Sequence, residues 1–246
     1  WSYGIGETLT LLVPNVKGGG SGSTMSQSEA AMAKANPMYN GIYSQLPQYF
    51  GEQPWTAGPV YVGAFVMFLF VLGCFIVKGS LKWALLGATI FSILLSWGKN
   101  FMGLTDFFID YVPMYNKFRA VSSILVIAEF TIPLLAIFAL KEILSKPDTL
   151  KLKENRGGVI ATLVLTAGVA LILAVAPGAF FSGFITTQEM AALKQALPAE
   201  HLAPFVANLT EMREAIIASD AWRSFFIIMI GCLFLFLYQQ RKLKAS

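Results

Sequence analysis

The sequence is poor in charge, histidine and cysteine. Only 13% of its 246 residues are Asp, Glu, Lys or Arg, whereas 56% are apolar, and this charged share is about half that of a typical soluble domain. The composition excludes intrinsic disorder and argues against an ordinary soluble domain. His201 has no second His or Cys near it, so a zinc site is not expected. Cys74 and Cys232 lie inside apolar runs, which excludes a disulfide framework or a cysteine-based metal site.

Recognisable catalytic and nucleotide motifs are also missing. The sequence contains no Gly-rich phosphate loop, no paired zinc ligands, no Ser/His/Asp set and no dinucleotide fingerprint. Any chemistry that these residues perform is therefore expected to depend on carboxylates or on a divalent cation at a membrane surface.

What the sequence does contain is five long apolar runs with few charges. A hydrocarbon core about 30 Å thick requires roughly 20 apolar residues in a helix. In lipid, every backbone N–H and C=O must be satisfied within the segment, so runs of this kind form helices. We therefore predict an all-α fold, a polytopic transmembrane helical bundle with about five spans at residues 59–77, 81–97, 121–140, 158–176 and 222–238.

The distribution of basic residues predicts the orientation of this bundle. If the N-terminal end lies outside, the inner stretches hold ten Lys and Arg residues, namely Lys78, Lys82, Lys141, Lys146, Lys151, Lys153, Arg156, Arg241, Lys242 and Lys244. Cytoplasmic loops carry such an excess. We expect the N-terminal end outside and the C-terminal end inside, with membrane lipid as a partner and no nucleic acid. Because the chain starts at Trp1 without an initiator Met or a signal peptide, we expect an internal fragment of a larger protein.

The polar segments divide the chain further. Residues 1–58 form an expected outer-face loop region, with a Gly/Ser tract at 18–23 that is typical of a flexible loop. Its aromatic part, 39–58, suits an interfacial belt or a surface on which a sugar stacks. Residues 59–176 hold four spans, with an outer loop at 98–120 and an inner loop at 141–157. Residues 177–221 are expected to form an outer-face lid of two short amphipathic helices broken by Pro198 and Pro204, and 222–246 form the final span and a basic inner tail.

The outer loop 98–120 combines charges and aromatic side chains. Asp106 and Asp110 are four residues apart, with Phe107 and Tyr111 on the apolar flank, which predicts a short helix lying in the outer interface. Two carboxylates one turn apart repel each other, so we expect a cation or a partner between them. Either the loop is an amphipathic anchor with internal ion pairs, or it binds a lipid phosphate or sugar phosphate. The candidate substrate-binding residues are Lys99, Asp106, Asp110, Tyr115, Lys117 and Arg119.

Glu129 is the only carboxylate inside a predicted span. An ionised carboxylate in lipid costs at least about 2.5 kcal/mol, so we expect Glu129 to face the bundle interior or a wet cavity. Pro133 follows four residues later and is expected to kink the helix. Two interpretations stay open: Glu129 is protonated or paired with a neighbouring span, or it takes part in a substrate or proton path.

Three stretches carry a resemblance to a known family. EQPWTAGPVYVG at 52–63, LLSWGKNF at 94–101 and DFFIDYVPMYNKFRAVS at 106–122 resemble the YfhO family of bacterial polytopic membrane proteins. That family is similar to glycosyltransferases of the GT-C architecture, so the resemblance implies a bacterial cytoplasmic (inner) membrane protein that handles a polyprenyl-phosphate sugar donor at the outer face. In that architecture the catalytic carboxylates usually lie in the first large outer loop, for which this chain has no matching segment. The resemblance therefore assigns no catalytic residue here.

Three functional hypotheses follow. A lipid-linked-sugar glycosyltransferase predicts an outer cavity lined by Lys117, Arg119 and aromatic side chains. A transporter or flippase predicts a midplane path at Glu129, beside unwound backbone at Pro133. A non-catalytic membrane scaffold predicts that the loop 98–120 is sealed by its own ion pairs.

Overall fold

The structure is a computed structural model that describes residues 1–181 and 183–240. Within these ranges the chain is helical, and the only β-type pairings are two isolated bridges. The α-helices are α1 (Glu29–Met32), α2 (Asn40–Tyr43), α3 (Ala64–Ile76), α4 (Leu81–Ser96), α5 (Met102–Tyr111), α6 (Val126–Ser145), α7 (Arg156–Leu163), α8 (Val169–Val175), α9 (Thr187–Ala196) and α10 (Ala199–Gln239). A π-helical turn, Val164–Gly168, joins α7 to α8. The 3₁₀ turns are Gly6–Leu11, Met25–Gln27, Pro37–Tyr39, Gly98–Phe101, Tyr115–Lys117, Val121–Leu125, Pro147–Lys151, Lys153–Asn155 and Pro177–Phe180.

The described residues contain three helical stretches that are long and apolar enough to cross a membrane. These are Val121–Ser145, Lys153–Val175 and Ala199–Gln239, and a bent pair, Leu81–Ser96 with Gly98–Tyr111, would make a fourth. The predicted span at 59–77 contributes only the 13 residues of α3, because the chain stays non-helical up to Gly63, which has a φ of 101°. The all-α membrane fold is thus present with three to four candidate spans.

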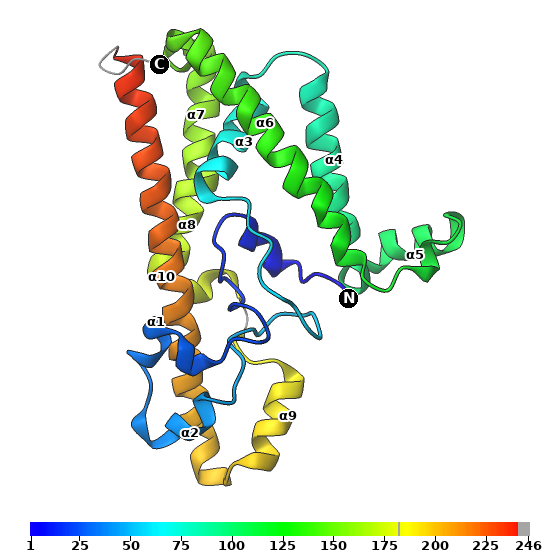
Figure 1. The fold of residues 1–246 in the computed structure, drawn as a ribbon, viewed down its shortest axis with the longest axis vertical. Helices are drawn as coiled ribbons and strands as arrows, with labels where there is room; N and C mark the ends of the chain where they lie inside the picture. Colours follow the sequence, from blue (N-terminus) through cyan, green and yellow to red (C-terminus); the bar gives the residue numbers. More distant parts are fainter. Residues whose placement is uncertain (182, 241–246) are drawn as a thin grey trace.

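The helices are arranged with their connections at two ends (Figure 1). The α3–α4 turn, the α6–α7 connection and the C-terminal end of α10 lie at one end, whereas α1, α2 and α9 surround the first half of α10 at the other. The predicted inner stretches 78–80 and 141–157 therefore share one end of the molecule. The third predicted inner stretch contains Arg241, Lys242 and Lys244, which lie outside the described residues.

The predicted lid and the predicted final span are not separate elements. Thr186 caps α9 by accepting a hydrogen bond from the Glu189 N–H at 3.2 Å. Pro198 then stands at the N-cap of α10, which continues for 41 residues to Gln239. Pro204 does not end this helix, although as a proline inside it the residue has no N–H to donate to the Glu200 carbonyl. The second predicted lid helix is the first part of α10.

The N-terminal segment is part of the bundle core. Tyr3, Leu11, Val13 and Val16 are buried in one continuous cluster with side chains of α3, α6, α8 and α10. A second cluster, built round Tyr43, lies between α1, α2, α9 and the first half of α10. Residues 1–58 are therefore folded onto the helices at one end of the molecule.

The Gly/Ser tract at 18–23, which the sequence predicted to be a flexible loop, packs against residues 48–57. Gly18 has a φ of +77°, and a Cβ there would lie 1.9 Å from the Gln48 carbonyl oxygen. The Phe50 N–H donates to the Lys17 carbonyl at 3.0 Å, and the Ser21 N–H donates to the Thr56 carbonyl at 2.9 Å. Glycine is needed here because two backbone segments touch, and not because the loop must move.

Candidate functional site

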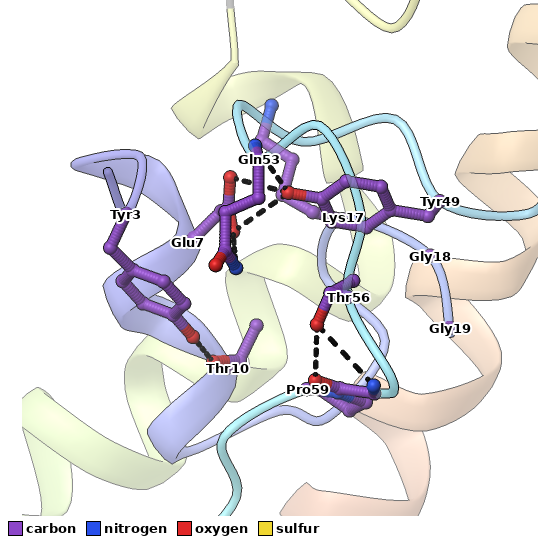
Figure 2. A pocket seen from close by; sticks show the side chains of 11 residues that line it. Tyr3, Glu7, Thr10, Lys17, Gly18, Gly19, Tyr49, Gln53, Thr56 and Pro59 are labelled. Atoms are coloured by element: carbon purple, nitrogen blue, oxygen red, sulfur yellow. Dashed lines mark hydrogen bonds between the residues drawn. The ribbon is translucent and has the colours of Figure 1, made fainter. Parts of the chain in front are cut away.

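The most strongly buried carboxylate in the N-terminal segment is Glu7, which lies in the turn Gly6–Leu11 and is 2% exposed. Its carboxylate accepts hydrogen bonds from the Tyr49 hydroxyl at 3.0 and 3.1 Å, from Gln53 Nε2 at 3.4 Å and from the Glu52 backbone N–H. Figure 2 shows Tyr49 and Gln53 beside the Glu7 carboxylate. Donors therefore reach both carboxylate oxygens from the segment 49–53.

A close backbone approach makes this arrangement possible. Gly51 lies directly over the carboxylate, and a Cβ there would be 2.5 Å from Glu7 Oε1 and 2.4 Å from the Tyr49 hydroxyl. The Gln53 N–H also donates to the Tyr49 hydroxyl at 2.8 Å, which fixes the ring that donates to Glu7. The turn 49–53 is thus shaped round one carboxyl group.

Lys17 supplies a cation at the same site. Its ammonium lies 4.3 Å from the centroid of the Phe181 ring and 5.2 Å from that of Phe50, which are cation–π distances. Within the described part of the chain, no carboxylate oxygen lies within 4.0 Å of Lys17 Nζ. In the described structure, the Lys17 amine therefore lies against aromatic rings and not in an ion pair.

A second cation beside the Phe50 ring has a carboxylate partner. The Arg213 guanidinium lies 4.8 Å from the Phe50 ring and is completely buried. It binds both carboxylate oxygens of Glu189 at 2.7 Å and also donates to the Phe184 carbonyl. This bidentate pair joins α9 to α10 beside the site.

Glu7 and Lys17 border a small polar cavity of about 10 Å³, which is room for roughly one water molecule. The Thr10 hydroxyl donates to the Val60 carbonyl at 2.9 Å, so the Tyr3 hydroxyl is the donor in its own bond to Thr10. The cavity is lined by Tyr3, Glu7, Thr10, Lys17, Gly18, Gly19, Tyr49, Gln53, Thr56, Gly58 and Pro59 (Figure 2).

Burial shifts the two charged groups in opposite directions. Loss of hydration raises the pKa of Glu7, although the hydrogen bonds from Glu52, Tyr49 and Gln53 partly oppose that rise. Loss of hydration lowers the pKa of Lys17, and the nearby Glu7 and Glu52 carboxylates partly oppose that fall. Burial therefore moves the pKa values of the acid and the amine toward each other, a kind of perturbation that is common at functional sites.

The predicted site residues of the loop 98–120 do not converge. The predicted helix is present as α5, but Asp106, Asp110, Lys117 and Arg119 are all exposed and enter no ion pair with one another among the described residues. Tyr115 is half-buried, with its ring 5.3 Å from that of Phe108.

Lys99 is the exception, because it lies near the Glu7 site. Its ammonium is 3.8 Å from Glu52, the residue whose backbone N–H donates to Glu7, although both side chains are more than half exposed. The start of the predicted outer loop and the Glu7 cavity are therefore neighbours in the fold.

Glu129, which was expected to face the bundle interior or a wet cavity, is not buried in the bundle core. The buried face of α6 follows Ala128, Ile132, Leu135 and Ala139, and Glu129 lies beside that face with its side chain exposed. α6 also continues as one helix through Pro133.

Glu7, Lys17, Tyr49 and Gln53 were not identified from the sequence. The available signal was a single acidic residue in the apolar stretch ETLTLLV, together with Tyr and amide side chains in 45–53. Their contact depends on residues 42 to 46 positions apart, a separation that no local pattern reports.

Neither a metal-binding group nor a similar protein adds a functional assignment. Among the described residues, no three His, Cys, Asp or Glu side chains are grouped so as to hold a metal ion. Comparison with protein families, with curated proteins and with solved structures finds no match to this chain.

Proposed function

We propose that this chain is part of a membrane-embedded, glycosyltransferase-like protein that handles polyprenyl-phosphate-linked sugars at the outer face of a bacterial cytoplasmic membrane. In this proposal the chain has about five spans, with its N-terminal end outside. The observation that carries the proposal is the buried Glu7 carboxyl beside the unpaired Lys17 ammonium, in a polar cavity near one end of apolar helices.

The two groups match the demands of such a transfer. A base must take the proton of the acceptor hydroxyl while the bond between the sugar and the carrier phosphate breaks, and the phosphate leaves with the bonding electrons. Glu7 would take the proton, and Lys17 would stabilise the charge on the departing phosphate. Because the cavity holds about one water molecule, entry of a sugar requires the segment 49–58 to move away from Glu7.

The transporter hypothesis receives less support. It requires an interrupted helix and a carboxylate near the middle of the bundle, whereas α6 is continuous through Pro133 and Glu129 is exposed. The scaffold hypothesis requires the loop 98–120 to be closed by its own ion pairs. In the described residues the ion pair of this loop is made with Glu52, outside the loop.

The test is sugar transfer by the full-length protein in membranes, at matched expression. Glu7→Gln keeps the size of the side chain and removes the base, and we expect transfer to fall by roughly 10²-fold or more. Glu29→Gln is the matched control, because Glu29 is an exposed carboxylate of the same N-terminal region. Unchanged transfer in Glu7→Gln, with normal insertion, would contradict the proposal and favour the scaffold.

The predicted binding residues are tested in the same assay. Arg119→Ala and Asp106→Asn address the proposal that the loop 98–120 handles the carrier phosphate. Loss of transfer in these variants would indicate that the loop forms part of the donor-binding site. Normal transfer would confine the chemistry to the Glu7 cavity or to other parts of the protein.

A further inference from the structure

The sequence after α4 forms an arm that the Glu7 site does not use. The helix over Gly98–Tyr111 is bent by 107° relative to α4, and α5 projects from the side of the molecule (Figure 1). None of the ten residues of α5 is buried. We define the aromatic arm as residues 101–118.

The aromatic arm has one narrow polar face. At 100° per residue, Gly103, Asp106 and Asp110 share about a sixth of the helix circumference. Most of the remaining circumference is apolar and includes Phe107 and Tyr111, which are 52% and 72% exposed. Met114 and Phe118, which follow the helix, are 73% and 68% exposed. This distribution is typical of a helix that lies flat in a membrane interface.

The exposed apolar surface continues from α4 onto the arm. Phe91 of α4 is 46% exposed, and its ring lies 5.7 Å from that of Phe108 on α5. Ile90, beside it, is 49% exposed. Whatever surrounds the apolar outer face of α4 therefore also reaches α5.

The base of the arm is fixed by the N-terminal segment. Trp97 Nε1 donates to the Thr8 hydroxyl at 2.9 Å, and Asn100 Nδ2 donates to the Tyr3 carbonyl at 2.8 Å. The Thr105 hydroxyl donates back to the Gly98 carbonyl at 2.7 Å, across the bend. The direction of α5 is thus set by hydrogen bonds at the corner.

We propose that the aromatic arm binds the lipid bilayer at the level of the headgroups, on the side where α4 ends. If α4 crosses the hydrocarbon core, its last residue, Ser96, lies at the boundary, and α5 begins six residues later. A bend of 107° then directs α5 along the membrane surface. Tyr111, on the side of the helix that Phe108 directs toward α4, faces the acyl chains, whereas Asp106 and Asp110 face water. This proposal requires membrane insertion but not sugar transfer.

Spin labels in reconstituted phosphatidylcholine vesicles test the proposal. Tyr111→Cys and Asp110→Cys are each labelled in a chain that carries Cys74→Ala and Cys232→Ala, with Ile90→Cys on α4 as the lipid-facing reference. Collisions of each label with lipid-soluble oxygen and with a water-soluble nickel complex are compared. Because both arm positions are exposed, the labels leave packing intact, which thermal unfolding checks.

The expected result is oxygen access at residue 111, similar to that at residue 90, and nickel access at residue 110. Nickel access at both arm positions would place the arm in water and overturn the proposal. Protection of both labels from both reagents would show that protein covers the arm, which also overturns it. No outcome depends on sugar transfer, so failure here is distinct from failure of the Glu7 proposal.

Discussion

Replacing Gly18 with Ala tests whether the packing of the glycine tract helps to form the Glu7 site. The added Cβ would lie 1.9 Å from the Gln48 carbonyl oxygen and 2.9 Å from the Tyr49 nitrogen. Both are backbone atoms, so the contact is relieved only if the segment 48–50 moves. That segment carries Tyr49, which donates to Glu7.

The expected loss of stability has two sources. An L-residue in the left-handed region costs about 1–2 kcal/mol, and the φ of Gly18 is +77°. Displacement of the segment would also weaken two backbone hydrogen bonds, from Phe50 to Lys17 at 3.0 Å and from Gln48 to Ser23 at 2.8 Å, each worth about 0.5–1.5 kcal/mol. The sum is about 3 kcal/mol, which corresponds to a melting temperature lower by about 6–12 °C for a chain of this size.

Thermal unfolding in detergent measures this loss. Gly22→Ala is the control, because a Cβ at Gly22 meets nothing within 4 Å, and we expect its melting temperature to stay within about 2 °C of wild type. If Gly18→Ala has the same melting temperature as Gly22→Ala and the wild type, the tract is flexible and the packing of Gly18 against residue 48 is wrong.

Three further predictions concern other parts of the structure. Arg213→Met leaves the Glu189 carboxylate largely buried without its partner and is expected to reduce the free energy of unfolding by about 3–5 kcal/mol; equal stability of the variant and the wild type in denaturant titrations would argue against the buried pair. Gly231→Ala places a Cβ 2.2 Å from the Phe65 ring, so α10 and α3 are expected to separate and the melting temperature to fall. An unchanged melting temperature would show that this ring turns away freely. Burial raises the pKa of Glu7 above its ordinary value of 4.5, so the folded state binds the proton more tightly than the unfolded state. This contribution to stability is complete below pH 4.5 and is lost as the pH rises through the pKa of the folded state. Thermal unfolding at a series of pH values measures this pH dependence of stability. Glu7→Gln is expected to remove it, and a Glu7→Gln variant with the wild-type pH dependence would refute the assignment.

Local patterns predicted much of the helical fold. The spacing of Asp106, Phe107, Asp110 and Tyr111 indicated the helix that the structure shows as α5, because side chains one turn apart share a face. Long apolar runs likewise marked α4, α6, α7 with α8, and the second half of α10, since run length and charge are local properties. Pro198 marked the break after α9 correctly, whereas the second lid helix was predicted to begin at Pro204 and α10 begins five residues earlier, at Ala199, and continues through that proline.

Contacts between distant segments could not be predicted in the same way. The glycine tract has the composition of a flexible linker, and only its packing against residues 48–57 makes it rigid. Glu7 is similarly one acidic residue in an apolar stretch, and its importance arises from donors more than 40 positions away. The direction of Glu129 depends on which face of α6 packs, and that face is fixed by α3 and α4 rather than by the residues around Glu129.

The pH profile of sugar transfer by the full-length protein tests the role of Glu7 most directly. If Glu7 is the base, transfer rises with pH through one ionisation whose pKa lies above 4.5, the ordinary value for a glutamate, because the carboxyl group must be ionised to accept a proton. Glu7→Gln is then expected to lose both the rate and this ionisation, while Glu29→Gln keeps both. A Glu7→Gln variant with the rate and pH profile of the wild type would contradict the account.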